Sequence, residues 1–185
     1  AMDSVLNSLS KRLNETEISN LLKPNDSPQV AVVVISSDRG LCGGFNANLY
    51  KEVNRQLEQI QQVDLYLVGA KSYQYFKRKD VKIVDHVPVF NEDEVGNSVL
   101  EDYVNKLVDS FEKGVYSKVY VIYNEFVSAL SSNQITKQIL PVELPDWDPN
   151  TITNSDFIYE SSKKSALDTF LSTYVNYLLS RMLIF

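Results

Sequence analysis

The sequence predicts an α/β protein with an open, mostly parallel sheet of about five strands and helices on both faces. Val30 to Ile35 are six consecutive apolar residues, as expected for a strand that is covered on both faces. They run into the glycine-containing stretch Ser36 to Asn46, and a helical pattern starts directly afterwards. A strand, a glycine loop and a helix in this order are typical of sheets whose ligands or partners meet the carboxyl ends of the strands.

The first half of the chain supplies the beginning of a β-α-β-α-β order. A stripe of leucine and isoleucine predicts a helix from about Asp3 to Leu22. The prolines of Lys23 to Pro28 then stop any helix. Apolar residues at spacings of three and four predict an amphipathic helix from Asn46 to Gln61. Val63 to Val68 is predicted as the second strand, and Ala70 to Lys79 as a short helix.

The second half completes the sheet. Val81 to Val87 is predicted as the third strand. Glu94 to Lys113 has a broad apolar face followed by Gly114, which predicts a helix with a C-terminal glycine. Lys118 to Tyr123 is predicted as the fourth strand. The fifth, Gln134 to Leu140, follows too closely for a crossover helix, so we expect it to be an antiparallel edge strand.

The C-terminal part of the chain is expected to lie outside the α/β domain. Pro141 to Thr153 is predicted as an irregular connector, and about Ser161 to Phe185 as a helix whose apolar pattern has no cap or final glycine. Asp168 and Arg181 interrupt it, which argues against a membrane anchor. Helices flanking an α/β domain, one of them cut off within its pattern, suggest remnants of a two-helix antiparallel coiled coil.

Composition limits the class of partner. The 185 residues are 44% hydrophobic, enough for one domain with an appendage. The formal net charge is -6 and the pI about 4.8, which argues against a nucleic-acid partner, because such proteins need a basic face. The single cysteine, Cys42, excludes an internal disulfide. No signal peptide is expected, and Ala1-Met2 is expected to be a tag remnant.

Three motifs carry further information: Ser37 to Asn46 after the first strand, Tyr123 to Leu130 at the end of the fourth strand, and Phe157 to Glu160 before the last helix. They resemble motifs at the same places in the gamma subunit of rotary, F-type ATP synthases. The motifs occur in the family's order and the resemblance covers essentially Val30 to Phe185, which is far more specific than one glycine pattern.

The resemblance implies a non-catalytic rotor component without a cofactor or a small-molecule substrate of its own. In that family, long terminal helices form a coiled coil that turns inside a ring of alpha and beta catalytic subunits, while a Rossmann-like foot domain binds the epsilon subunit and the membrane c-ring. The implied layout is 1–23, a remnant of the N-terminal shaft helix; 24–28, a linker; 29–153, the foot domain; and 154–185, the truncated start of the C-terminal shaft helix.

The implied function is to couple hydrogen ion or other ion transport through the c-ring to ATP synthesis or hydrolysis. The complex would then lie on the cytoplasmic face of a bacterial inner membrane, the fragment itself being soluble. Val87 to Gly96 lacks the cysteine-bearing insertion of the chloroplast members, so thiol regulation is not expected.

The resemblance also implies two groups of contact residues. Arg39, Cys42 and Lys51 are expected near the acidic lever of the catalytic subunits. Solvated pairs there are worth only about 0 to 1 kcal/mol and can be released by a rotor; an equally weighted alternative is that Arg39 braces its own loop. The second group is Phe157, Tyr159 and Glu160, expected at the c-ring and epsilon subunit, the alternative being a partly buried start to the last helix. Phe157 replaces the family's usual tyrosine.

Other functions remain alternatives. A nucleotide-binding Rossmann-like domain fits poorly, because Gly40 to Gly44 lacks the Gly-x-Gly-x-x-Gly spacing and no phosphate-loop lysine follows. Cys42 and His86 would make a thiol nucleophile and base, although nothing in their spacing requires them to meet. The acidic run Glu92 to Glu94 is better explained as negative charge before the N-terminus of the next helix, which favours it, than as a set of metal ligands. A generic protein-interaction module of the same fold is the third alternative.

Overall fold

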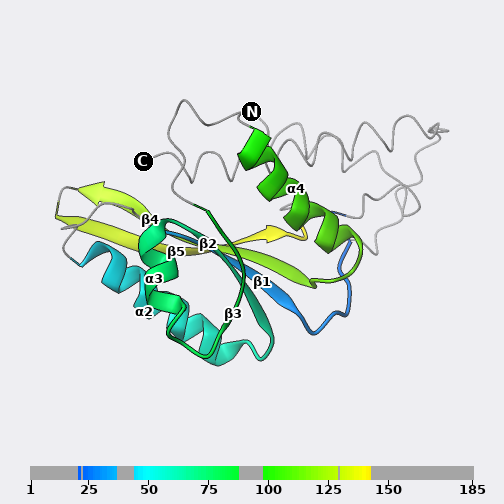
Figure 1. Ribbon diagram of the computed structural model, residues 1–185, viewed down its shortest axis with the longest axis horizontal. Coiled ribbons are helices and arrows are strands. Elements are labelled where there is room, and N and C mark those ends of the chain that lie inside the picture. Colours follow the sequence, from blue (N-terminus) through cyan, green and yellow to red (C-terminus); the bar gives the residue numbers. More distant parts are fainter. Residues whose placement is uncertain (1–20, 22, 37–43, 88–97, 129, 143–185) are drawn as a thin grey trace, which may run out of the picture.

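The computed structural model describes residues 21, 23–36, 44–87, 98–128 and 130–142, and all structural statements below concern these residues. One sheet carries helices on both of its faces: α2 and α3 lie on one side and α4 on the other (Figure 1). The elements in chain order are β1 (Val30–Ile35), α2 (Phe45–Gln59), β2 (Val63–Val68), α3 (Ala70–Phe76), β3 (Lys82–Val87), α4 (Ser98–Glu112), β4 (Lys118–Ser128) and β5 (Ser131–Leu140).

The sheet has five strands in the order β3-β2-β1-β4-β5. β1 lies at the centre, pairs in parallel with both β2 and β4, and is buried along its whole length. β3 is parallel to β2, and β5 is antiparallel to β4. This confirms the predicted α/β class, the parallel core of the sheet and the antiparallel edge strand.

The edge strand β3 is interrupted by a bulge. Leu65 of β2 is opposite Ile83 and Tyr66 is opposite Asp85, so Val84 has no partner across the ladder and is 44% exposed. A bulge locally disrupts pairing and increases twist, which makes an edge strand a poor template for another strand.

The core on the α2 and α3 face is apolar. Alternate residues of β1 point there, because side chains along a strand alternate between faces. They pack with side chains of β2, β4 and both helices. The buried residues of this core are Val30, Val32, Val34, Leu49, Tyr50, Val53, Leu65, Leu67, Phe76 and Ile122.

The α4 face contains a buried polar network. The Asp64 carboxylate accepts hydrogen bonds from the Tyr116 hydroxyl and the Gln29 side-chain amide, both at 2.8 Å, and lies 3.4 Å from the Lys82 ammonium. The Tyr66 and Tyr116 hydroxyls are 2.8 Å apart. Burial raises the pKa of both tyrosines, so their hydroxyls stay protonated and able to donate. The network joins the amino-terminal ends of β1, β2 and β3 to the segment before β4.

The fourth and fifth strands are longer than predicted. β4 continues five residues past the predicted end at Tyr123, and β5 begins before the predicted Gln134. The pairing of β4 with β1 ends at Ile122, and the following residues pair only with β5. This two-stranded ribbon extends beyond the rest of the sheet at the left of Figure 1. The residues of this ribbon form no continuous apolar run, so their sequence does not predict a strand.

Among the remaining predicted elements, β2 has the predicted ends, and the others agree in type and differ at their ends. α3 ends at Phe76 and not at Lys79, and α4 begins at Ser98, the predicted start at residues 94–97 being outside the described part. Leu21 lies in a turn. The other residues of both predicted terminal helices, and with them the coiled-coil remnants, are outside the described residues. Among the described helices, none has the length and apolar content of a membrane span.

Candidate partner-binding surface

The carboxyl ends of the three strands β1, β2 and β3 are locked together where the chain enters residues 37–43. Ser36 donates from its backbone nitrogen to the Val68 carbonyl at 2.9 Å, and from its hydroxyl to the same oxygen at 3.1 Å. The next residue after β2, Gly69, donates to the Val87 carbonyl at 2.8 Å. Gly69 has a φ of 106°, and a Cβ there would lie 2.6 Å from the Ser36 carbonyl oxygen. The predicted partner loop therefore starts from a rigid base.

The start of α2 is tied to the ribbon of β4 and β5. The buried Asn124 donates from its amide to the Phe45 carbonyl at 3.1 Å. Its amide oxygen accepts a hydrogen bond from the Gln134 amide at 2.7 Å. Phe45 belongs to the first sequence motif and Asn124 to the second. The structure thus brings two motifs together that lie far apart in the sequence.

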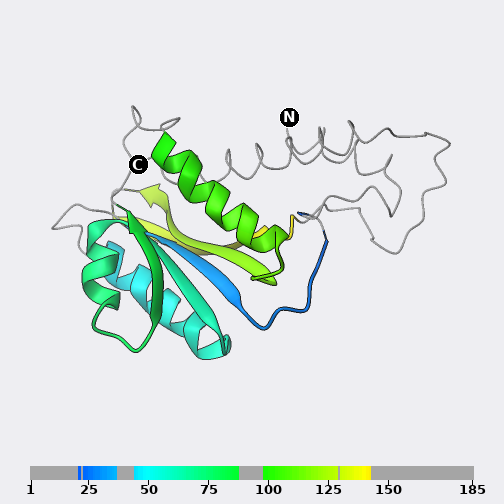
Figure 2. The same ribbon diagram turned by 45° about the vertical axis from the view of Figure 1, so that its right-hand side comes forward.

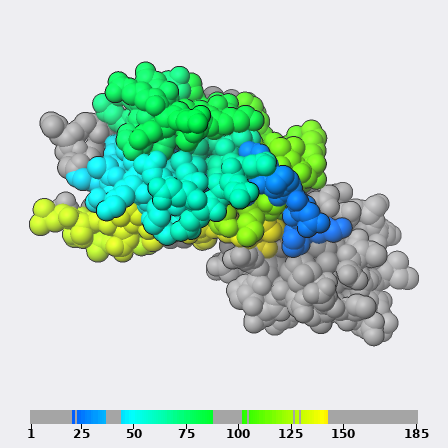
Figure 3. All heavy atoms as spheres, turned by 90° about the horizontal axis from the view of Figure 1, so that it is seen from below, coloured from blue at the N-terminus to red at the C-terminus, as the bar shows by residue number. Residues whose placement is uncertain are grey.

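An open groove of about 980 Å³ runs along α2, lined by side chains of α2, α3 and β5. In the space-filling view, α2 lies between β5 and the α3–β3 segment (Figure 3). The residues that line the groove are Ala47, Asn48, Tyr50, Lys51, Glu52, Asn54, Arg55, Glu58, Tyr75 and Gln134. Most of these residues are polar or charged in type, although the surface that they turn to the groove is largely apolar, and a groove this open suits a protein partner better than an enclosed small molecule.

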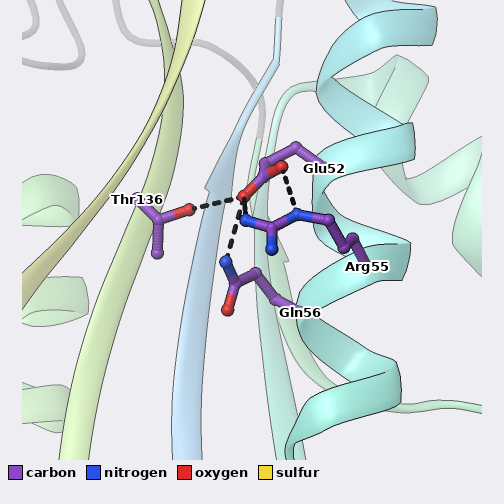
Figure 4. Close-up of polar contacts among 4 residues, drawn as sticks. All are labelled: Glu52, Arg55, Gln56 and Thr136. Carbon is purple, nitrogen blue, oxygen red and sulfur yellow. Dashed lines mark hydrogen bonds and ion pairs between the residues drawn. The ribbon is translucent and has the colours of Figure 1, made fainter.

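A compact ionic cluster occupies the side of the groove (Figure 4). Arg55 donates to Glu52 from Nη2 at 2.6 Å and from Nε at 2.9 Å. Gln56 donates to the same carboxylate at 3.0 Å, and the Thr136 hydroxyl at 3.3 Å. The Arg55 hydrogen bonds, with those of Gln56 and Thr136, lower the pKa of Glu52 to about 2, against the effect of partial burial. The ionised cluster connects α2 to β5, and it neutralises the Arg55 charge within the protein.

Lys51 is the one predicted contact residue that the structure describes. Its exposed side chain lines the groove one turn before Arg55. It forms no hydrogen bond or ion pair with another described residue, so its charge is available to a partner. The other two lever residues, Arg39 and Cys42, lie outside the described residues, and so do Phe157, Tyr159 and Glu160 of the second group.

The alternative chemistries have little support in the described part. The His86 ring stacks on Tyr73 with centroids 3.9 Å apart and planes inclined by 8°, which is a packing contact. Its predicted thiol partner, Cys42, is outside the described residues. Within the described ranges, no three His, Cys, Asp or Glu side chains gather as metal ligands.

The sequence reasoning missed the ionic cluster. A glutamate followed three residues later by an arginine on a predicted helix was a usable signal for the pair of Glu52 and Arg55. The contribution of Thr136 was not accessible, because it depends on how β5 lies beside α2. The hydrogen bonds of Asn124 depend in the same way on the ribbon.

The fold places the protein in a structural class. It is similar to a chain in the central stalk and c-ring structure of the Tetrahymena thermophila mitochondrial ATP synthase, with a TM-score of 0.64, 19% identity, and coverage of 97% of this chain and 79% of that chain. A chain in the Euglena gracilis mitochondrial ATP synthase rotor gives a TM-score of 0.51 at 15% identity, covering 89% of this chain and 66% of that one. These likenesses show that the protein shares the α/β fold of chains found in ATP synthase central stalks.

Sequence comparison gives the family. The family described as ATP synthase matches residues 1–184. The ATP synthase gamma chain of Desulfitobacterium hafniense is 32% identical, over 84% of this chain and 54% of that protein. The gamma chain of Geobacter sp. is also 32% identical, over 92% of this chain and 60% of that protein. The chain belongs to the ATP synthase gamma chain family, and it spans a little over half the length of these relatives.

Proposed function

We propose that this protein is the foot of an ATP synthase rotor: a non-catalytic central-stalk component that couples rotation of a membrane c-ring to ATP synthesis or hydrolysis in the alpha and beta subunits. The observation that carries the proposal is the family match over residues 1–184. The similarity in fold to central-stalk chains supports it. The proposed layout is the one expected from the sequence: shaft helix 1–23, linker 24–28, foot domain 29–153 and second shaft helix 154–185.

Two carboxylates of the described part hold separate segments of the domain together. Glu52 is held by Arg55 and Thr136, and Asp64 by Tyr116, Gln29 and Lys82. Glu52 thereby connects α2 to β5, and Asp64 connects β2 to β3 and to the segments before β1 and β4. Such arrangements suit a body that keeps its shape while partners move past it.

The proposed contact with the acidic lever of the catalytic subunits involves Arg39, Cys42 and Lys51. The exposure of Lys51 supports it, as does the rigid base from which residues 37–43 depart. Exposed ion pairs contribute about 0 to 1 kcal/mol, so that contacts of this kind are broken easily as a rotor turns. The proposed foot contacts, Phe157, Tyr159 and Glu160, would face the c-ring and epsilon subunit on the cytoplasmic side of a bacterial membrane.

The first test is complex formation with the cognate epsilon subunit. We expect the chain and epsilon to co-elute in size-exclusion chromatography at low salt. If the two proteins elute separately at micromolar concentrations, the foot assignment loses its main support.

The second test addresses the lever contact in the full-length subunit. Arg39→Ala with Lys51→Ala should alter assembly or the coupling of ATP hydrolysis to proton pumping in membrane vesicles. Lys113→Ala with Lys137→Ala removes the same charge from two other exposed positions and should leave coupling unchanged. Equal coupling in both double variants would exclude the lever contact while leaving complex formation with epsilon as an independent result.

A further inference from the structure

The turn between α3 and β3 is strongly basic in an otherwise acidic chain. Lys77, Arg78, Lys79 and Lys82 fall within six residues, with Asp80 as the single carboxylate, whereas the whole chain has a net charge of -6. All four cationic side chains are exposed. Figure 2 shows this turn at the outer corner of the domain, at the lower left. We call these four residues the basic corner.

Aromatic rings lie beside two of the charges of the basic corner, and carboxylates neutralise these charges only slightly. The Lys77 ammonium lies 5.7 Å from the centre of the Tyr73 ring, and the Lys79 ammonium 5.2 Å from that of Tyr75. Contacts of this kind favour a limited set of rotamers without cancelling the charge, which lowers the entropic cost of binding. Arg78 forms no ion pair with a described residue. Of the four, Lys82 alone forms an ion pair with a described carboxylate, that of Asp64 at 3.4 Å, and this carboxylate already accepts two hydrogen bonds.

The basic corner lies at the opposite end of the sheet from the carboxyl end of β1. Lys82 begins β3 and is opposite Asp64 near the start of β2, whereas residues 37–43 follow the carboxyl end of β1. A strand of six residues spans about 20 Å. The basic corner is therefore set apart from the carboxyl end of β1, and it adjoins the groove along α2, because Lys79 lies over Tyr75, which lines the groove together with Lys51.

We propose that the basic corner binds a carboxylate-rich segment of a partner protein. Arg78 and the half-buried Tyr73 and Tyr75 are of residue types enriched at protein interfaces, and the lysines add positive charge complementary to carboxylates. A uniformly anionic lipid surface would repel Asp80, whereas a protein surface can place a donor or a cation opposite it. The bulge at Val84 disfavours the addition of a strand to β3, so that recognition has to use side chains.

Binding is tested with a fluorescein-labelled deca-glutamate peptide, followed by fluorescence anisotropy at low salt. We expect saturable binding that salt weakens and that a deca-glutamine peptide does not reproduce. Arg78→Gln with Lys79→Gln should raise the apparent Kd about tenfold, since two exposed charge contacts are lost. The control, Lys113→Gln with Lys137→Gln, has the same net charge and should change the Kd less than about twofold. Thermal melts of both double variants check that the fold is kept.

A second measurement locates the peptide. Carbodiimide cross-linking joins a lysine to a carboxylate in direct contact, and mass spectrometry should find the cross-links at Lys77, Lys79 or Lys82. Cross-links confined to Lys113 or Lys137, equal weakening in both double variants, or no binding to the unmodified protein would each overturn the proposal. So would tighter binding to phosphatidylserine vesicles than to the peptide, which would assign the basic corner to a membrane. None of these outcomes depends on the rotor function.

Discussion

Gly69→Ala should be severely destabilising, because two separate costs meet at this position. The φ of 106° lies in a region that residues with a side chain rarely adopt, at a cost of about 1 to 3 kcal/mol. The new Cβ would also lie 2.3 Å from the Ser36 hydroxyl and 2.6 Å from the Ser36 carbonyl oxygen. Rotating the hydroxyl away gives up its hydrogen bond to Val68, about 1 kcal/mol, and the carbonyl can move only with β1. These two costs sum to about 2 to 4 kcal/mol, and displacement of the Ser36 carbonyl adds to them.

Gly114→Ala is the matched control. Its φ of 75° is also positive, but a Cβ there meets nothing within 4 Å. Only the backbone cost remains, about 1 to 2 kcal/mol. Urea denaturation followed by far-ultraviolet circular dichroism measures both free energies of unfolding, with comparable m-values as the condition for comparing them.

The comparison isolates the close approach between the ends of β1 and β2. If Gly69→Ala costs no more than Gly114→Ala, the steric argument is wrong. Adding Ser36→Ala to Gly69→Ala removes the hydroxyl clash but keeps the carbonyl clash, so we expect only partial recovery of stability. Complete recovery would show that the backbone contact is unimportant.

Two further predictions concern buried and half-buried polar groups. Tyr116→Phe removes a hydrogen-bond donor to the buried Asp64 and should lower the free energy of unfolding, measured by urea denaturation, by about 1 to 3 kcal/mol. Tyr103→Phe removes a buried hydroxyl that has no partner among the described residues and should be neutral or stabilising. Equal losses of stability in the two variants would contradict this prediction. The pKa of Glu52 is about 2 in the folded protein and 4.5 ordinarily, so the stability it contributes is complete above pH 4.5 and is lost as the pH falls towards 2. The urea midpoint of Glu52→Gln should therefore fall less between about pH 6 and about pH 3 than that of the unmodified protein, and parallel curves would refute the assignment.

The sequence was sufficient for the elements whose signal is local. Val30 to Ile35 has the continuous apolar run of a strand buried on both faces, and the structure gives this strand the same ends. The short connection before Gln134 correctly predicted an antiparallel edge strand. The predicted end of β4 at Tyr123 was wrong, because Asn124 and Glu125 carry no apolar pattern and are strand only through their pairing with β5.

The candidate site was less predictable, because its geometry depends on contacts between distant segments. Lys51 lies within the predicted helix Asn46 to Gln61 and its side chain is exposed, while its contact with a partner stays a prediction. The joining of α2 to the ribbon through Asn124 and Gln134 requires knowledge of the sheet order, which no local spacing contains. The buried carboxylate of Asp64 was likewise hidden within an apolar run, and its partners Gln29 and Tyr116 come from other parts of the chain.

The central position of β1 determines how the domain responds to mechanical force. The chain passes from β1 directly into residues 37–43, and β1 is flanked by parallel ladders to β2 and β4. A pull along β1 from its carboxyl end acts in shear, so the hydrogen bonds of both ladders resist it together and do not open one after another. A strand at the edge would have a single ladder. A force applied at residues 37–43 is therefore shared by the hydrogen bonds of β1 with β2 and with β4 before any one strand can slip.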